Sequence, residues 1–109
     1  MKSDLLKDIT ATYEKHGWKL KKVLLSPNSK TELENLTGVL CEATVEDAAF
    51  DALWFSRPST PGTEAWELRL MAETPYALFE KVESDATEHK KEAILRGMEA
   101  RLRHYVEAT

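Results

Sequence analysis

Cysteine is scarce in this chain, and Cys41 is the only one among its 109 residues. A single thiol cannot close an intrachain disulfide, and it cannot provide the thiolate cluster of a cysteine-based metal site. Because most lone cysteines are small buried hydrophobes, we expect Cys41 to be reduced, slow to react and without a catalytic role. This usage suits a reducing compartment, and the N-terminal residues lack a signal-peptide pattern, so the sequence predicts a cytoplasmic protein.

Other absences narrow the classes of function. The four glycines are scattered and form no phosphate-binding loop, and no apolar run approaches the ~20 residues that span a bilayer. The net charge is −4 with both signs interspersed, whereas nucleic-acid binders carry a basic patch. His16, His89 and His104 do not share a metal-ligand spacing. We therefore expect no membrane, nucleic acid, metal or cofactor as a partner, and no catalytic residue stands out.

Helical periodicity is present at both ends of the chain. Apolar residues recur at helical spacing over residues 4–16, and Gly17 follows as a stop signal. A second and longer helix is predicted after Asp85. Its apolar face has three- and four-residue steps and consists of Ile94, Leu95, Met98, Leu102, Tyr105 and Val106. Charged residues fill much of the rest of this helix, so the apolar face is expected to pack on a sheet.

Between these helices the chain alternates between strand and helix signals. Residues 18–26 first alternate between apolar and charged side chains and then become apolar on both sides. This pattern predicts a strand that enters the core. A capping-box pattern predicts a short helix over 30–37. Residues 39–45 alternate again and predict a strand, with a turn at 46–48. The segment 45–49 fits a helical turn equally well.

A three-stranded meander follows, with strands predicted over 50–57, 64–72 and 76–82 and turn residues between them. Consecutive hairpins predict an antiparallel sheet of three to five strands, with the N-terminal and the long C-terminal helix packed on one face. The sequence thus predicts a single two-layer α+β domain over residues 1–109. In general layout it resembles small secretion chaperones, although no motif is shared.

Side chains alternate across a strand, so the register can be chosen by the pairing that keeps apolar residues together. Trp54 opposite Leu68 and Leu70 opposite Leu78 meet this condition. The resulting core face consists of Phe50, Ala52, Trp54, Trp66, Leu68, Leu70, Tyr76, Leu78 and Val82. Both tryptophans of the meander are then expected to be buried on the same side of the sheet.

The other face of the meander is not purely polar. It carries the apolar residues Leu53, Phe55, Met71, Ala77 and Phe79. A solvated sheet face alternates more cleanly, so we expect this face to be covered, most simply by the same face of a second subunit around a two-fold axis. A charge at Phe55 or Phe79 is then expected to give a folded monomer.

Charged residues share this second face. The predicted register sets Glu67 opposite Lys81, and Arg57 and Arg69 either join such cross-strand ion pairs or form an aromatic–arginine patch typical of protein interfaces. The candidate interface residues are Leu53, Phe55, Arg57, Arg69, Met71 and Phe79. Glu80 is the one charge on the apolar face. It either reaches solvent near the sheet end or marks a pocket.

Two functions fit these patterns. The first is a non-enzymatic interaction module that uses the second sheet face to bind a protein partner or to form a homodimer. The alternative is a small enzyme or ligand-binding protein with a pocket between the sheet and the C-terminal helix. A solid core with a flat exposed apolar face would favour the first, and a deep apolar cavity holding a buried Glu80 or a histidine would favour the second.

Overall fold

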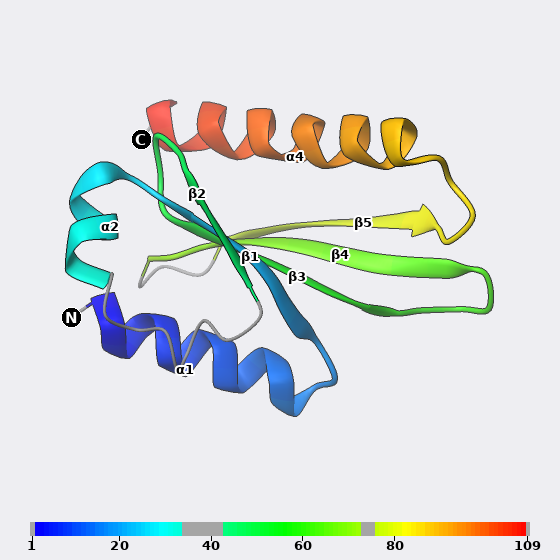
Figure 1. Ribbon diagram of the computed structural model, residues 1–109, viewed down its shortest axis with the longest axis horizontal. Coiled ribbons are helices and arrows are strands. Elements are labelled where there is room, and N and C mark those ends of the chain that lie inside the picture. Colours follow the sequence, from blue (N-terminus) through cyan, green and yellow to red (C-terminus); the bar gives the residue numbers. More distant parts are fainter. Residues whose placement is uncertain (1, 34–42, 73–75, 109) are drawn as a thin grey trace.

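The computed structural model describes residues 2–33, 43–72 and 76–108, and Figure 1 shows how its helices and strands are arranged. The elements, in chain order, are α1 (Lys2–Lys15), β1 (Lys19–Leu25), α2 (Pro27–Leu33), β2 (Thr44–Asp47), β3 (Ala52–Pro58), β4 (Thr63–Leu70), β5 (Ala77–Glu83) and α4 (Glu88–Ala108). Three predictions lie outside the described residues: the state of Cys41, the end of the short predicted helix and the beginning of the strand predicted after it.

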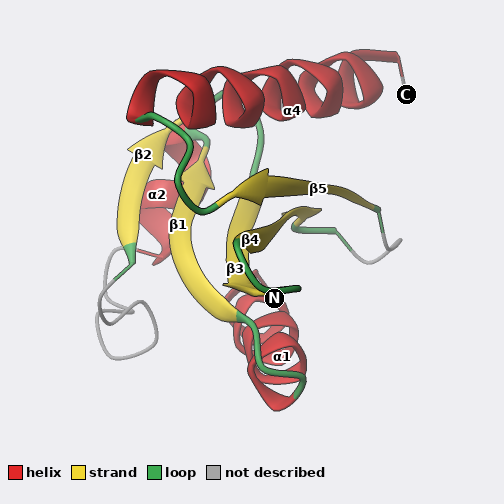
Figure 2. Ribbon diagram, turned by 90° about the vertical axis from the view of Figure 1, so that its right-hand side faces the viewer, coloured by secondary structure: helices red, strands yellow, loops and turns green. Residues whose placement is uncertain are grey.

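The predicted fold class is confirmed. An N-terminal helix, a five-stranded and mostly antiparallel sheet, and a long C-terminal helix make an α+β fold. The layering corrects the prediction that both helices share one face. α4 packs on one face of the sheet and α1 on the other, so there are three layers (Figures 1 and 2). The reason is that the meander is apolar on both faces, and each apolar face needs its own cover.

The strands lie in the order β2-β1-β3-β4-β5. β1 pairs in parallel with β2 and antiparallel with β3, so it lies inside the sheet, and its apolar C-terminal run is buried on both faces. The turn predicted at 46–48 is wrong for its first two residues. Glu46 and Asp47 instead extend β2, because they pair with Leu24 and Leu25 of β1.

The register within the meander is partly as predicted. Trp54 lies opposite Leu68, as expected. Leu78, however, lies opposite Leu68 rather than Leu70, so β5 is displaced by two residues from the predicted pairing. A displacement of two residues leaves every side chain on its predicted face, because side chains alternate with a period of two.

Beneath α4 lies the core that holds the tryptophans. Trp54 and Trp66 are both buried there, as predicted, with their rings edge to face at a centroid distance of 6.0 Å. Met98 and Leu102 of α4 pack into the same cluster. The Trp54 indole N–H donates to Oε2 of Glu99 at 2.8 Å. α4 is therefore held on the sheet by apolar packing and by a hydrogen bond that satisfies a buried donor.

Candidate functional site

The face that the sequence assigns to a partner is largely covered by the chain itself. Leu53 and Phe55 are fully buried and Met71 is nearly so, in a cluster with Leu6 and Ile9 of α1. Figure 1 shows α1 lying along this face of the sheet. The expectation of a cover was therefore sound, but the cover is α1. This corrects the prediction that Leu53, Phe55 and Met71 belong to an interface, since a partner could reach them only by displacing α1.

The end of α1 positions an aromatic side chain that the sequence did not single out. Gly17 has a φ of 87°, a left-handed conformation that side chains with a β-carbon adopt only with strain. The chain turns back here in a Schellman motif. The Gly17 N–H donates to the Glu14 carbonyl at 3.0 Å, and the Trp18 N–H donates to the Tyr13 carbonyl at 3.0 Å. The motif thereby sets Trp18 beside Tyr13.

A series of aromatic contacts runs from this buried face to the surface. Tyr13 stacks on the buried Phe55 at a centroid distance of 4.1 Å. Trp18 meets Tyr13 edge-on at 6.0 Å, and Phe79 of β5 meets Trp18 edge-on at 6.3 Å. Phe79 is 49% exposed, and every other large hydrophobic side chain that the structure describes is buried or partly buried. The apolar packing under α1 thus ends in an exposed ring at the border of the sheet.

Arg57 lies over the Trp18 ring rather than in the predicted cross-strand ion pair. Its guanidinium carbon is 4.7 Å from the centroid of the Trp18 ring, a cation–π arrangement. Its Nη1 donates to the His16 carbonyl at 2.8 Å. We call the group formed by Trp18, Arg57 and Phe79 the aromatic patch. Two of the predicted interface residues, Arg57 and Phe79, therefore lie together on the surface.

Arg69, the remaining interface candidate, is bound to its own chain. It is only partly exposed, and its Nη1 donates to the Leu70 carbonyl and, at 3.5 Å, to the Ala72 carbonyl. These bonds satisfy carbonyls where β4 ends. Arg69 therefore stabilises the C-terminal end of β4, and the structure does not bring it into the aromatic patch.

Tyr13 and Glu67 form a polar contact under α1. Glu67 lies opposite Phe79, rather than opposite Lys81 as the sequence predicted, and its Oε2 accepts a hydrogen bond from the Tyr13 hydroxyl. Burial raises the pKa of the Tyr13 hydroxyl above its ordinary value. The hydrogen bond to Glu67 and the negative charge of Glu67 raise this pKa further, and nearby Arg69 opposes them.

This shift predicts a loss of stability at alkaline pH. Folded Tyr13 keeps a proton that the unfolded chain releases above about pH 10, so the free energy of unfolding should fall as the pH rises beyond that value. Tyr13→Phe should make this fall shallower. Urea unfolding at several pH values from neutral to alkaline measures both slopes. Because the other tyrosines are present in both proteins, equal slopes would contradict the assigned role of Tyr13.

β5 is an edge strand, and its outer side pairs with no other strand of the described chain. The Leu70 N–H donates to the Tyr76 carbonyl and the Ser84 N–H donates to the Gly62 carbonyl, each at 2.9 Å. In an antiparallel ladder these bonds identify the residues that face β4, and the alternate residues face outward. The outward-facing residues of β5 are Ala77, Phe79, Lys81 and Glu83. Phe79 therefore offers both its ring and its backbone groups at this edge.

Glu80 does not line a closed pocket. Its side chain is 46% exposed, and a carboxylate oxygen lies 3.8 Å from Nη1 of Arg101 on α4. Arg101 also borders a groove of about 550 Å³ along the β5 side of α4, where the rings of Tyr76 and Tyr105 stack at 3.7 Å. We call this hollow the α4 groove. Its other lining residues are Ala100, His104 and Ala108.

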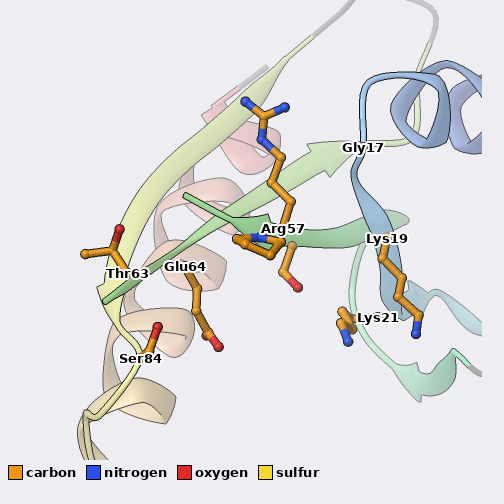
Figure 3. Close-up of a pocket in the computed structure, with 9 residues that line it drawn as sticks. Gly17, Lys19, Lys21, Arg57, Thr63, Glu64 and Ser84 are labelled. Atoms are coloured by element: carbon orange, nitrogen blue, oxygen red, sulfur yellow. The ribbon is translucent and has the colours of Figure 1, made fainter. Parts of the chain in front are cut away.

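A second hollow, of about 410 Å³, lies at the end of the sheet where β3 turns into β4. In Figure 3, Lys19 and Lys21 of β1 lie on one side of it, and Glu64 lies across from them. The guanidinium group of Arg57 points away from both lysines. The hollow therefore presents charges of both signs and does not form a cluster of cations suited to an anionic ligand.

Glu64 is held in this hollow by neighbours of the α4 core. The Trp66 indole N–H donates to Oε1 of Glu64 at 3.0 Å and holds the pKa of this carboxyl below its ordinary value. Lys91 of α4 lowers the same pKa, with its Nζ 3.5 Å from the carboxylate. Lys91 also lies 4.7 Å from the centroid of the Trp66 ring. These contacts fasten the start of α4 to the sheet, which is a structural role for Glu64.

Among the residues that the structure describes, no group of three or more His, Cys, Asp and Glu side chains is placed to hold a metal ion. In the same residues, no helix is long and apolar enough to cross a membrane.

The comparisons with known proteins give no assignment. No protein-family model matches the chain, and neither a curated protein nor a solved structure matches it. At one border of the sheet, the geometry brings together two features: the aromatic patch and the outer edge of β5, which pairs with no other strand of the described chain.

Proposed function

We propose that this chain is a non-enzymatic protein-interaction module that binds its partner along the sheet border formed by β5 and the aromatic patch. The observation that carries the proposal is the exposed Phe79 on an edge strand. Unpaired N–H and C=O groups at such an edge are a template for another strand. An exposed aromatic ring beside them adds apolar contact area that a protein partner can remove from water.

The composition of the aromatic patch supports a protein partner. Aromatic residues and arginine are enriched at protein interfaces and supply much of the binding energy there. Trp18 is already held between Tyr13 and Arg57 by ring contacts. Because these side chains are ordered before binding, little conformational entropy is lost when a partner packs on them.

The alternative, a ligand-binding or catalytic pocket between the sheet and α4, has less support. Trp54, Leu68, Met98 and Leu102 are at most 1% exposed and pack together in that space. Glu80, the residue proposed to mark such a pocket, is instead half-exposed beside Arg101. A filled core with an exposed aromatic at its border is the combination that favours an interaction module.

Charge and cysteine usage support a protein partner in the cytoplasm. The chain carries a net charge of −4, and Glu64 lies across the second hollow from Lys19 and Lys21. Nucleic-acid binders instead concentrate positive charge on one surface. A single cysteine in the chain suits a reducing compartment.

Photo-crosslinking in cells that make the protein tests this function. The photoreactive amino acid p-benzoylphenylalanine at position 79 is expected to join the chain to another polypeptide and to give a discrete adduct on a denaturing gel. The matched control is the same amino acid at position 93, where Ala93 is exposed on α4. No adduct from position 79, or the same adduct from both positions, would contradict the proposal.

A further inference from the structure

We propose that the partner on this border is a second copy of the chain, with β5 paired antiparallel to β5 of the other subunit around a two-fold axis at Phe79. This inference rests on the proposed function and names its partner. The proposed pairing of the two β5 strands joins two five-stranded sheets into one continuous sheet. A two-fold axis makes the contact isologous, so one strand must be complementary to itself.

The backbone limits the possible registers. The outward-facing residues of β5 are every second one, beginning with Ala77. In an antiparallel pair, outward-facing residues must lie opposite each other to exchange hydrogen bonds. A symmetric pairing of β5 with itself must therefore be centred on a single residue. Centring it on Phe79 lets Ala77, Phe79 and Lys81 pair with Lys81, Phe79 and Ala77 of the copy, which forms about six hydrogen bonds.

Charge opposes two of the other possible registers. A pairing centred on Glu80 would place two carboxylates opposite each other, and one centred on Lys81 would place two ammonium groups opposite each other. Like charges directly across a strand pair are destabilising. The pairing centred on Phe79 avoids both contacts, because Glu80 then lies opposite Leu78 of the copy. It also uses every residue from Tyr76 to Val82.

The same register covers the exposed apolar groups on both faces of the sheet. On the α1 face, the 49% exposed ring of Phe79 meets the ring of its copy, and aromatic pairs are favourable across strands. Lys81 becomes the diagonal neighbour of the copy's Phe79, within reach of its ring face. On the α4 face, Tyr76 lies opposite Val82 of the copy, next to the α4 groove that Tyr76 itself lines.

Edge strands of monomeric proteins are usually protected by charges, prolines or bulges. β5 has Lys81 and Glu83 toward its C-terminal end but carries an exposed phenylalanine at the centre of the proposed pairing. It is also free of proline, and no bulge interrupts its pairing with β4. The unprotected centre of β5 can pair with another strand. The charges toward the C-terminal end of β5 oppose registers that are displaced from this centre.

Sedimentation velocity at several concentrations tests the pairing with charge-swap variants. The wild type is expected to be a dimer that dissociates on dilution. Phe79→Glu and Phe79→Lys should each be folded monomers, because each places like charges across the two-fold axis, and each should weaken association at least about 30-fold, as for an interface hot spot. An equimolar mixture of the two variants should associate again, because opposite charges then meet. Ala93→Glu, which adds a charge on the exposed side of α4, is the matched control and should remain a dimer.

The outcomes separate this inference from the proposed function. A wild type that stays monomeric at every concentration overturns the self-pairing, as does a dimer that persists in both Phe79 variants. A crosslinked adduct whose mass is not that of two copies also overturns the self-pairing, yet it supports the interaction function. Association restored only in the mixture supports the two-fold pairing at Phe79. Far-UV circular dichroism of each variant checks that loss of association is not loss of folding.

Discussion

Phe55→Glu is expected to abolish the cooperative unfolding transition, because it places a charge where water has no access. Phe55 is fully buried, and its ring stacks on Tyr13. Truncating a buried phenylalanine costs ~3–5 kcal/mol, and an unpaired buried carboxylate costs several kcal/mol more. Together these losses reach the ~5–15 kcal/mol by which most domains are stable. Urea unfolding followed by far-UV circular dichroism should show a flat trace for this variant.

Phe79→Glu is the matched control for this prediction, since it makes the same exchange on the same sheet face beyond the cover of α1. Its side chain is 49% exposed, so the free energy of unfolding should change by no more than about 1 kcal/mol when measured at a concentration where the protein is monomeric. A Phe55→Glu variant that unfolds as the wild type does would mean that α1 does not cover this face in solution.

Trp54→Ala should lower the free energy of unfolding by ~3–5 kcal/mol. Trp54 is 1% exposed and packs edge to face against Trp66. Its removal leaves a cavity under α4 and also leaves the Glu99 carboxylate without the indole N–H that it accepts from. Far-UV circular dichroism in urea measures the loss without relying on tryptophan fluorescence.

Trp18→Ala is the control for the loss of an indole ring. Trp18 is only partly buried and lies in the aromatic patch, so its truncation should cost clearly less than that of Trp54, because less apolar area returns to water. Equal losses for the two variants would show that the α4 core does not dominate the stability of this fold.

The sequence predicted which face of the sheet each side chain occupies, because alternation along a strand is a local property. Trp54 and Leu68 pair as expected, and the apolar excess around Phe55 did indicate a cover. The identity of that cover was not predictable from the same pattern. An amphipathic helix shows that it has an apolar face, but its sequence does not say on which side of a sheet that face will pack.

A local pattern also cannot predict which residues lie opposite each other on neighbouring strands. A displacement of two residues between β4 and β5 keeps all side chains on their faces, so alternation cannot distinguish Leu68 from Leu70 as the partner of Leu78. The strand order likewise depends on contacts between distant segments. For this reason the sequence indicated Phe79 and Arg57 as interface candidates but could not show that β5 is an edge, or that Trp18 joins them through the turn at Gly17.

The position of β1 inside the sheet has a consequence for the order in which contacts form. β3, β4 and β5 form two consecutive hairpins, so their pairing closes short loops and needs only local encounters. β1 is synthesised early but pairs with β3, whose residues follow much later in the chain. During synthesis, the apolar side chains of α1 and β1 therefore precede the meander that covers them, whereas α4 follows directly after β5, the last strand of the sheet. We therefore expect α1 and β1 to be the segments whose apolar side chains stay uncovered longest while the chain is made, and so the segments most open to aggregation or chaperone binding.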